Sequence, residues 1–223
     1  EEPDFADNAS RFSFLSRAAF QLCRTLTWIP DIIHAHDWPT ALVPVYLKYQ
    51  EAHTDFNKTY SVLTIHNLGY QGIYSQDKFI HTGLDWTLFK KAGFEDWDKM
   101  NLLKAGLLSA DKLTTVSPTY VEETKTHAYG FRMDEILRSC ADDYVGILNG
   151  IDDDVWNPEK DNTIPCNYSF GDMSGKSENK RILQKEFSLP QEAHVPVIGM
   201  VTRLTEQKGI GELFGPAYGS AWS

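Results

Sequence analysis

The sequence predicts an α/β protein with parallel sheets that belong to two partial domains. Short apolar runs rich in β-branched residues alternate with amphipathic helical patterns along the 223 residues. No internal repeat is present, and one long polar stretch interrupts the pattern. Because strand, helix and strand in succession form right-handed crossovers, the strands should be parallel.

The first half of the chain supplies the elements of one predicted sheet. After polar N-cap candidates, residues 7–26 predict a helix with an apolar stripe at Phe12, Leu15, Ala19, Leu22 and Leu26. Ser117 and Pro118 predict the start of a later helix, since both residue types favour the first helical turn. The remaining elements are strands at 30–35, 59–67, 111–117 and 144–150, and helices at 96–110 and 118–127.

A boundary between two domains is predicted in the second half. Residues 157–180 are rich in Asn, Asp, Ser, Gly and Pro, and they precede a predicted helix at 178–187 and a strand at 195–203. We therefore expect a partial N-terminal domain at 1–158, a linker and interdomain connection at 159–194, and the start of a truncated second domain at 195–223.

Composition excludes several classes of function. With 31 acidic and 21 basic residues, the net charge of −10 repels nucleic acids and anionic membranes. No apolar run approaches the roughly 20 residues that cross a bilayer. The 3 cysteines are widely spaced without a CxxC pair, which disfavours a disulfide framework and a thiolate zinc site. These observations predict a cytosolic protein without nucleic-acid or membrane partners.

Polar residues follow four of the predicted strands. His34 and His36 lie at the end of the first strand, His66 lies at the end of the second, Asn149 and Gly150 close the strand at 144–150, and Arg203 ends the last. Because ligands bind beyond the carboxyl ends of parallel strands, these positions predict a ligand site.

The loop after the last strand favours an anionic ligand. Arg203 and Lys208 bring two cations near the start of the next predicted helix, where free backbone N–H groups also attract a phosphate. The loop does not match the glycine-rich phosphate motifs, so an ordinary solvated loop explains it equally well.

Six segments in order resemble the bacterial glycogen synthase and plant starch synthase family. The resemblance implies a GT-B fold with two facing Rossmann-like domains, and transfer of glucose from ADP-glucose to the non-reducing end of an α-1,4-glucan with retention. It implies no cofactor and no metal, and a bacterial cytoplasm or, in a plant or alga, a plastid. The segments are "DIIHAHDWPTALVPVYLK", "SVLTIHNLGYQGIY", "NLLKAGLLSADKLTTVSPTY", "GILNGIDDDVWNPEKD", "ENKRILQKEFSL" and "VTRLTEQKGI".

The resemblance also implies roles for individual residues at the donor. Arg203 and Lys208 match the cationic pair that holds the donor diphosphate and stabilises the departing ADP. His36 matches a histidine near the glucosyl ring, where an imidazole can orient the sugar. Asn149 matches an asparagine close to donor and glucose, although Asn-Gly is equally the usual pair for a tight turn.

The acceptor side is implied by the loop "HNLGYQG". His66, Tyr70 and Gln71 match residues that border the cleft and meet the glucan through polar groups and an aromatic face. His34 would lie on the same strand face as His36. A side chain that is packed and hydrogen-bonded within the protein is a better explanation for a histidine at this position than direct contact with sugar.

Two other functions compete with this interpretation. His34 and His36 could form the His-x-His part of an amidohydrolase metal site, but the other histidines lack metal-ligand spacing. A non-catalytic carbohydrate-binding or structural fragment is the stronger rival. The family's lysine-glycine loop would precede Glu1 and its acidic donor segment would follow Ser223, while Pro216 interrupts the last expected helix. We therefore expect the chain alone to be inactive.

Overall fold

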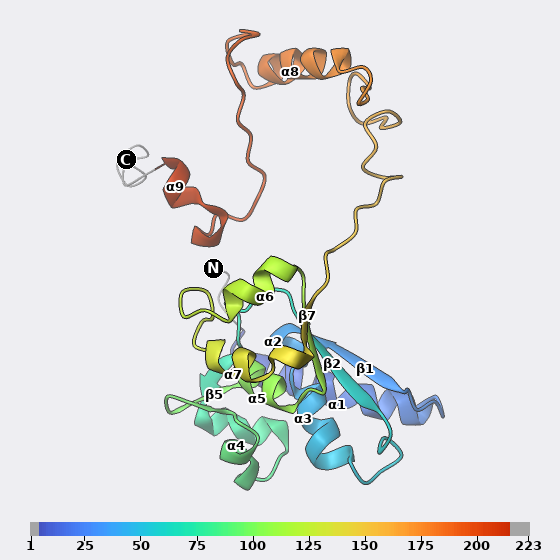
Figure 1. Cartoon of the computed structure of the whole chain (residues 1–223), viewed down its shortest axis with the longest axis vertical. Coiled ribbons are helices and arrows are strands. Elements are labelled where there is room, and N and C mark those ends of the chain that lie inside the picture. Colours follow the sequence, from blue (N-terminus) through green and yellow to red (C-terminus); the bar gives the residue numbers. More distant parts are fainter. Residues whose placement is uncertain (1–4, 215–223) are drawn as a thin grey trace. The chain divides into compact units, whose positions relative to one another are not determined.

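The computed structural model describes residues 5–214, which divide into two compact units (Figure 1). One unit lies within Pro3–Asn149 and the other within Gly150–Ser223. Pro216 lies outside the described residues. Among the described residues, no helix is both long and apolar enough to span a bilayer. The predicted domain limits at residues 158 and 194 stay a proposal.

The first unit is built on a parallel sheet, so the predicted α/β class is confirmed. Its 4 strands lie in the order β1-β2-β6-β7, and every neighbouring pair is parallel. The strands are β1 (Ile32–His36), β2 (Tyr60–Ile65), β6 (Lys112–Thr115) and β7 (Tyr144–Gly146). Their carboxyl ends therefore lie along one edge of the sheet.

Helices connect these strands and enclose a continuous apolar core (Figure 1). The helix α3 contacts β1, β2 and α5, and α6 contacts β6 and β7. As predicted, Ser117 caps α6, where its Oγ accepts a hydrogen bond from the Tyr120 N–H at 3.3 Å. The helices are α1 (Asn8–Thr25), α2 (Asp37–Thr40), α3 (Leu42–Tyr46), α4 (Thr87–Lys91), α5 (Leu102–Ser109), α6 (Pro118–Thr124) and α7 (Asp134–Ser139), with a π-helical turn at Leu47–Glu51 and 3-10 turns at Gln76–Thr82 and Ala141–Asp143.

The helix predicted at 96–110 was wrong in its first turn and a half. That segment contributes to an antiparallel sheet in the order β3-β5-β4, formed by β3 (Ile73–Ser75), β4 (Glu95–Asp96) and β5 (Lys99–Asn101). Trp97 and Asp98 make the turn between β4 and β5 with positive φ angles. Asn101 then caps α5, because its Oδ1 accepts from the Lys104 N–H at 2.9 Å.

The helix α1 is present, but it buries a different face from its apolar stripe. Ser13, Ser16 and Phe20 are buried, whereas Leu15 and Leu22 are exposed. Small side chains permit close packing, and the Ser16 hydroxyl donates to the backbone oxygen of Pro39 at 3.4 Å. The stripe was visible in the sequence, but the face that packs depends on tertiary contacts.

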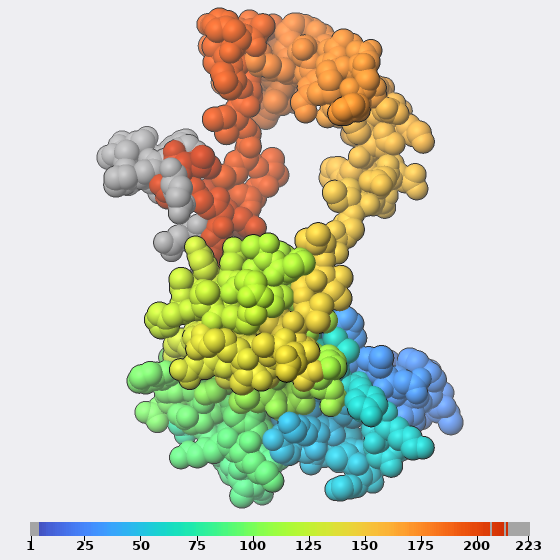
Figure 2. Space-filling model, viewed as in Figure 1, coloured from blue at the N-terminus to red at the C-terminus, as the bar shows by residue number. Residues whose placement is uncertain are grey.

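The second unit is described by itself and has little core. It holds α8 (Ser174–Glu186), a 3-10 turn at Glu206–Lys208 and α9 (Ile210–Phe214). Of its residues whose side chains the structure describes, only Gln184 and Ile210 are buried. In Figure 2 the yellow atoms at the start of this unit form a narrow stretch, and the orange atoms that include α8 form a broader group.

The strand predicted at 195–203 is absent, which corrects that expectation. The described residues of this unit include no strand with which it could pair. A single extended segment has no partners for its backbone N–H and C=O groups, so a strong strand sequence alone cannot form a sheet. Ile198 and Val201 are accordingly exposed.

Replacing Gly106 in α5 should destabilise the first unit. A Cβ at this position would lie 2.7 Å from the Ala41 backbone oxygen. We expect Gly106→Ala to lower the free energy of unfolding, because overpacking costs about 1–3 kcal/mol and exceeds the gain in helix propensity of up to about 1 kcal/mol. Urea denaturation measures the change, and Gly150→Ala, which meets nothing within 4 Å, is the control. An unchanged or higher stability of Gly106→Ala would contradict the close approach.

Candidate functional site

Two histidines meet where β1 and β2 end. His36 is the last residue of β1 and pairs in register with Thr64, and His66 directly follows β2. Parallel pairing therefore brings the two side chains to the same edge. The Nδ1 of His36 lies 3.0 Å from the Nε2 of His66, so one ring donates a hydrogen bond to the other. Both side chains are exposed, so the pair presents polar ring atoms to a ligand.

His34 extends this pair into a row of three rings, which we call the histidine edge (His34, His36 and His66). The rings of His34 and His36 stack with centroids 4.3 Å apart. The Nε2 of His34 lies 2.6 Å from the hydroxyl of Thr64, which lies 2.5 Å from the hydroxyl of Thr114. Side chains from three neighbouring strands thus fix the ring of His34. It has a partner, as the sequence favoured, although its side chain is exposed.

Asp37 links the two loops beyond the sheet, and sequence analysis gave it no role. Its carboxylate accepts from the His66 backbone N–H at 2.7 Å and more distantly from that of Asn67 at 3.4 Å. The residue has φ +53°, a left-handed conformation that Asp tolerates better than most residues. The sequence shows Asp37 directly after the His-x-His pair. Only the register of the strands shows that its carboxylate binds the backbone of His66.

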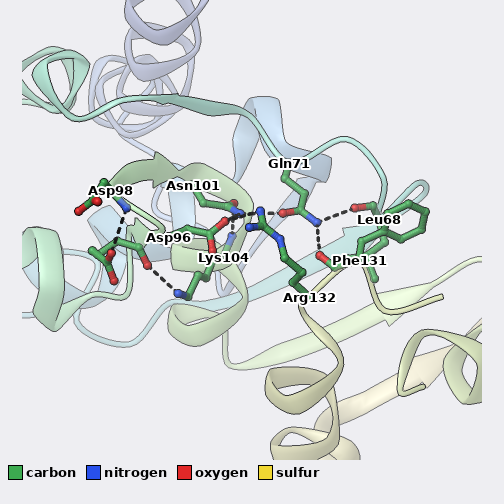
Figure 3. Close-up of polar contacts among 9 residues, drawn as sticks. Leu68, Gln71, Asp96, Asp98, Asn101, Lys104, Phe131 and Arg132 are labelled. Atoms are coloured by element: carbon green, nitrogen blue, oxygen red, sulfur yellow. Dashed lines mark hydrogen bonds and ion pairs between the residues drawn. The ribbon is translucent and has the colours of Figure 1, made fainter. Parts of the chain in front are cut away.

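The loop that follows His66 is held at several points. The N–H of Leu68 donates to the hydroxyl of Tyr120 at 3.2 Å. Gln71 is only 6% exposed, and its amide nitrogen donates to the backbone oxygens of Leu68 and Phe131 at 3.2 and 2.9 Å (Figure 3). These bonds of Gln71 are internal, and its predicted contact with an acceptor stays a prediction. Tyr70 beside it is half-buried.

The surroundings of His36 favour its neutral form. Burial lowers the pKa of His36 below its ordinary value, and the neighbouring His34 and His66 lower it further, while Asp37 opposes the shift. A neutral imidazole both donates and accepts hydrogen bonds, which suits a partner made of hydroxyl groups. Burial also raises the pKa of Tyr120, so its hydroxyl stays protonated.

The other predicted site residues have exposed side chains. Asn149 is exposed, three residues beyond the end of β7. Arg203 and Lys208 are exposed side chains of the second unit. A short turn connects them, because the Thr205 N–H donates to the Arg203 oxygen at 2.9 Å and the Lys208 N–H to the Thr205 oxygen at 3.0 Å.

A metal site is not evident in the part of the chain that the structure describes. There, no group of three or more His, Cys, Asp or Glu side chains could hold a metal ion. The three rings of the histidine edge instead stack on or bond to one another. The geometry thus offers no support for the amidohydrolase alternative, and the expected lack of a metal requirement stays a prediction.

Comparisons with known proteins agree on one family. Residues 1–139 match the family described as "Starch synthase catalytic domain". The chain is 57% identical over 221 residues to the glycogen synthase of Treponema denticola, covering 99% of this chain and 45% of that protein. It is 48% identical over 211 residues to the glycogen synthase of Thermosipho africanus, covering 94% of this chain and 43% of that protein.

A solved structure shows the same architecture. The catalytic domain of starch synthase IV from Arabidopsis thaliana, bound to ADP and acarbose, matches with a TM-score of 0.85 at 34% identity. The match covers 99% of this chain and 46% of that one. It confirms the GT-B fold class. The chain therefore spans less than half the length of the relatives it matches.

The lowered pKa of His36 predicts a dependence of stability on pH. In the unfolded chain His36 takes up a proton near its ordinary pKa of 6.5, whereas in the folded chain it does so only at a lower pH. The unfolded state then binds more protons, so the free energy of unfolding should fall as pH decreases through 6.5. His36→Gln should reduce this loss, as measured by urea denaturation at pH 7.5 and 5.5. His53→Gln, on an exposed turn, is the control; an identical pH dependence in the His36 variant and the wild type would contradict the assignment.

Proposed function

We propose, because the chain belongs to the starch synthase catalytic domain family, that it is part of a glycogen or starch synthase. The enzyme would transfer glucose from ADP-glucose to the non-reducing end of an α-1,4-glucan with retention of anomeric configuration. The observation that carries the proposal is the His36–His66 pair at the carboxyl edge of the parallel sheet. In such sheets this edge is where ligands bind.

The predicted site residues have complementary tasks in this proposal. In the transfer, the bond between the anomeric carbon and the β-phosphate oxygen breaks, a bond from the anomeric carbon to the acceptor hydroxyl oxygen forms, and the proton of that hydroxyl passes to the departing phosphate. ADP leaves with increased negative charge, and Arg203 and Lys208 supply positive charge to stabilise it. Preorganised charge of this kind is usually the largest contribution to catalysis. A metal is not needed for this role.

The histidine edge would bind and orient sugar. Neutral His36 can hydrogen-bond a glucosyl hydroxyl and place the anomeric carbon for transfer. His66, bonded to His36, and Tyr70 on the same loop are proposed to meet the acceptor glucan, with Gln71 as a further acceptor residue. The ring of His34 stacks on that of His36 and can hold it in place. Asn149 is proposed to lie near the donor.

The net charge of the chain is compatible with a polysaccharide substrate. A net charge of −10 disfavours nucleic acids and anionic membranes, whereas a neutral glucan is not repelled. We propose the cytoplasm as its compartment in a bacterium, and a plastid in a plant or alga.

Alanine substitution of the two cations tests the proposed donor site. In the full-length protein, Arg203→Ala or Lys208→Ala should lower kcat by about 10²–10³-fold if each cation contributes like one oxyanion-hole donor. His36→Ala should instead disturb placement of the glucosyl group. Incorporation of radiolabelled glucose from ADP-glucose into glycogen measures the rates.

Lys185→Ala is the matched control, because Lys185 is an exposed cation of the same unit outside the loop. Near-wild-type turnover of both cation variants would refute the diphosphate assignment. Saturable glucan binding without any glucose transfer by the full-length protein would favour the non-catalytic alternative.

A further inference from the structure

A network of polar side chains, buried except for the exposed Arg132, connects three segments of the first unit. It joins the β4–β5 hairpin, the loop that carries His66 and the segment before α7 (Figure 3). Its members are Asp96, Asn101, Gln71 and Arg132. Among these four residues only Gln71 has a proposed role, as a sugar contact. Asp96, Asn101 and Arg132 have none.

The hydrogen bonds start at the carboxylate of Asp96, which is 6% exposed. Its Oδ2 accepts from the Arg132 guanidinium at 2.8 Å and from the Asn101 amide nitrogen at 3.1 Å. The same Asn101 nitrogen donates to the Oε1 of Gln71 at 2.7 Å. The Asn101 oxygen is used as well, since it caps α5. Asn101 is completely buried, so water cannot replace these partners.

The charge of Asp96 and the Lys104 N–H that binds the Asn101 oxygen together set the direction of the bonds in this network. A carboxylate only accepts hydrogen bonds, so Asn101 must turn its NH₂ group toward it. The second hydrogen of that group then points at Gln71, which must present its oxygen. The NH₂ group of Gln71 is therefore left to donate to Leu68 and Phe131. If either amide were reversed, two acceptors or two donors would face each other.

The loop after His66 and the segment before α7 both depend on the last link. Gln71 fixes the backbone oxygen of Leu68, two residues from His66, while Tyr120 binds the Leu68 N–H. Phe131 and Arg132 have φ angles of +46° and +69°, a conformation unfavourable for side chains of this size. The bonds to the Phe131 oxygen and from the Arg132 guanidinium hold this backbone in place.

We propose that Asp96 is a positioning residue for the histidine edge. Its carboxylate orients the Asn101 and Gln71 amides, and through them it fixes the loop on which His66 meets His36. The effect of this orientation on sugar transfer rests on the proposed function, but the effect on the histidines does not. Asp96 touches none of the proposed sugar-binding residues except through these amides.

Asp96→Asn tests the proposal with little change in shape. An asparagine can present either its oxygen or its NH₂ group, so after the substitution only the Lys104 N–H still orients the Asn101 amide. Asp98→Asn is the matched control, since it removes the same charge from the same hairpin, and Asp98 is joined to its surroundings in Figure 3 through its backbone N–H. Gln71→Leu, made in parallel, removes only the final link.

The readout is the histidine ring signals in NMR spectra of the 223-residue chain labelled with ¹³C-histidine. We expect Asp96→Asn and Gln71→Leu to shift or broaden the signals of His36 and His66, with Asp98→Asn like the wild type. Circular dichroism identifies the variants that fold. Unchanged His36 and His66 signals in either folded variant would overturn the proposal.

A second measurement uses the full-length protein and separates the proposal from the proposed function. In Asp96→Asn the loop that carries His66 should lose stabilisation equivalent to about one hydrogen bond, which should raise KM for the glucan acceptor about fivefold. KM for ADP-glucose should rise by less, because His36 lies at the end of β1 and not on this loop. Equal increases in both constants would contradict a local positioning role. If the full-length protein transfers no glucose at all, the proposed function fails, and the histidine signals still decide the role of Asp96.

Discussion

The parallel register of β1 and β2 is the constraint on which the candidate site depends. Pairing of His36 with Thr64 places the residues that follow each strand at one edge of the sheet. Asp37 can then bind the backbone of His66, and the His36 and His66 rings can meet at 3.0 Å. The same register sets His34 near Thr64, and the register of β2 and β6 sets Thr64 beside Thr114. A shift by one residue would turn these side chains to the opposite face and separate all of these groups.

Burial and exposure divide the polar groups of the first unit into two sets. Asp96, Asn101 and Gln71 are buried and bonded to one another, so they stabilise a fixed backbone. The histidine edge is exposed, with rings that stack on or bond to each other and leave capacity for sugar hydroxyls. The second unit differs, because few of its described side chains are buried. Arg203 and Lys208 belong to this unit. Its described residues provide little packing that could fix the positions of these two side chains.

Sequence patterns predicted the elements that depend on neighbouring residues in the chain. They missed the elements that depend on contacts with distant segments. The strands predicted at 30–35 and 59–67 correspond to β1 and β2, and Ser117 caps α6 as predicted. The β4–β5 hairpin was missed, because Asn101 caps α5 with its side chain and the preceding residues pair with β3. The strand predicted at 195–203 has no pairing partner in the described unit. The burial of Gln71 could not be foreseen, since its partners Asn101 and Phe131 are 30 and 60 residues away.

We propose that sugar binds at the histidine edge, and NMR of the full-length protein labelled with ¹³C-histidine tests this claim. ADP-glucose and a short α-1,4-glucan are added separately while the ring signals are followed, and calorimetry establishes whether each ligand binds. We expect ADP-glucose to shift the His36 signal and the glucan to shift the His66 signal, each saturating with the bound fraction. Saturable binding of both ligands with His36 and His66 unchanged would contradict the claim.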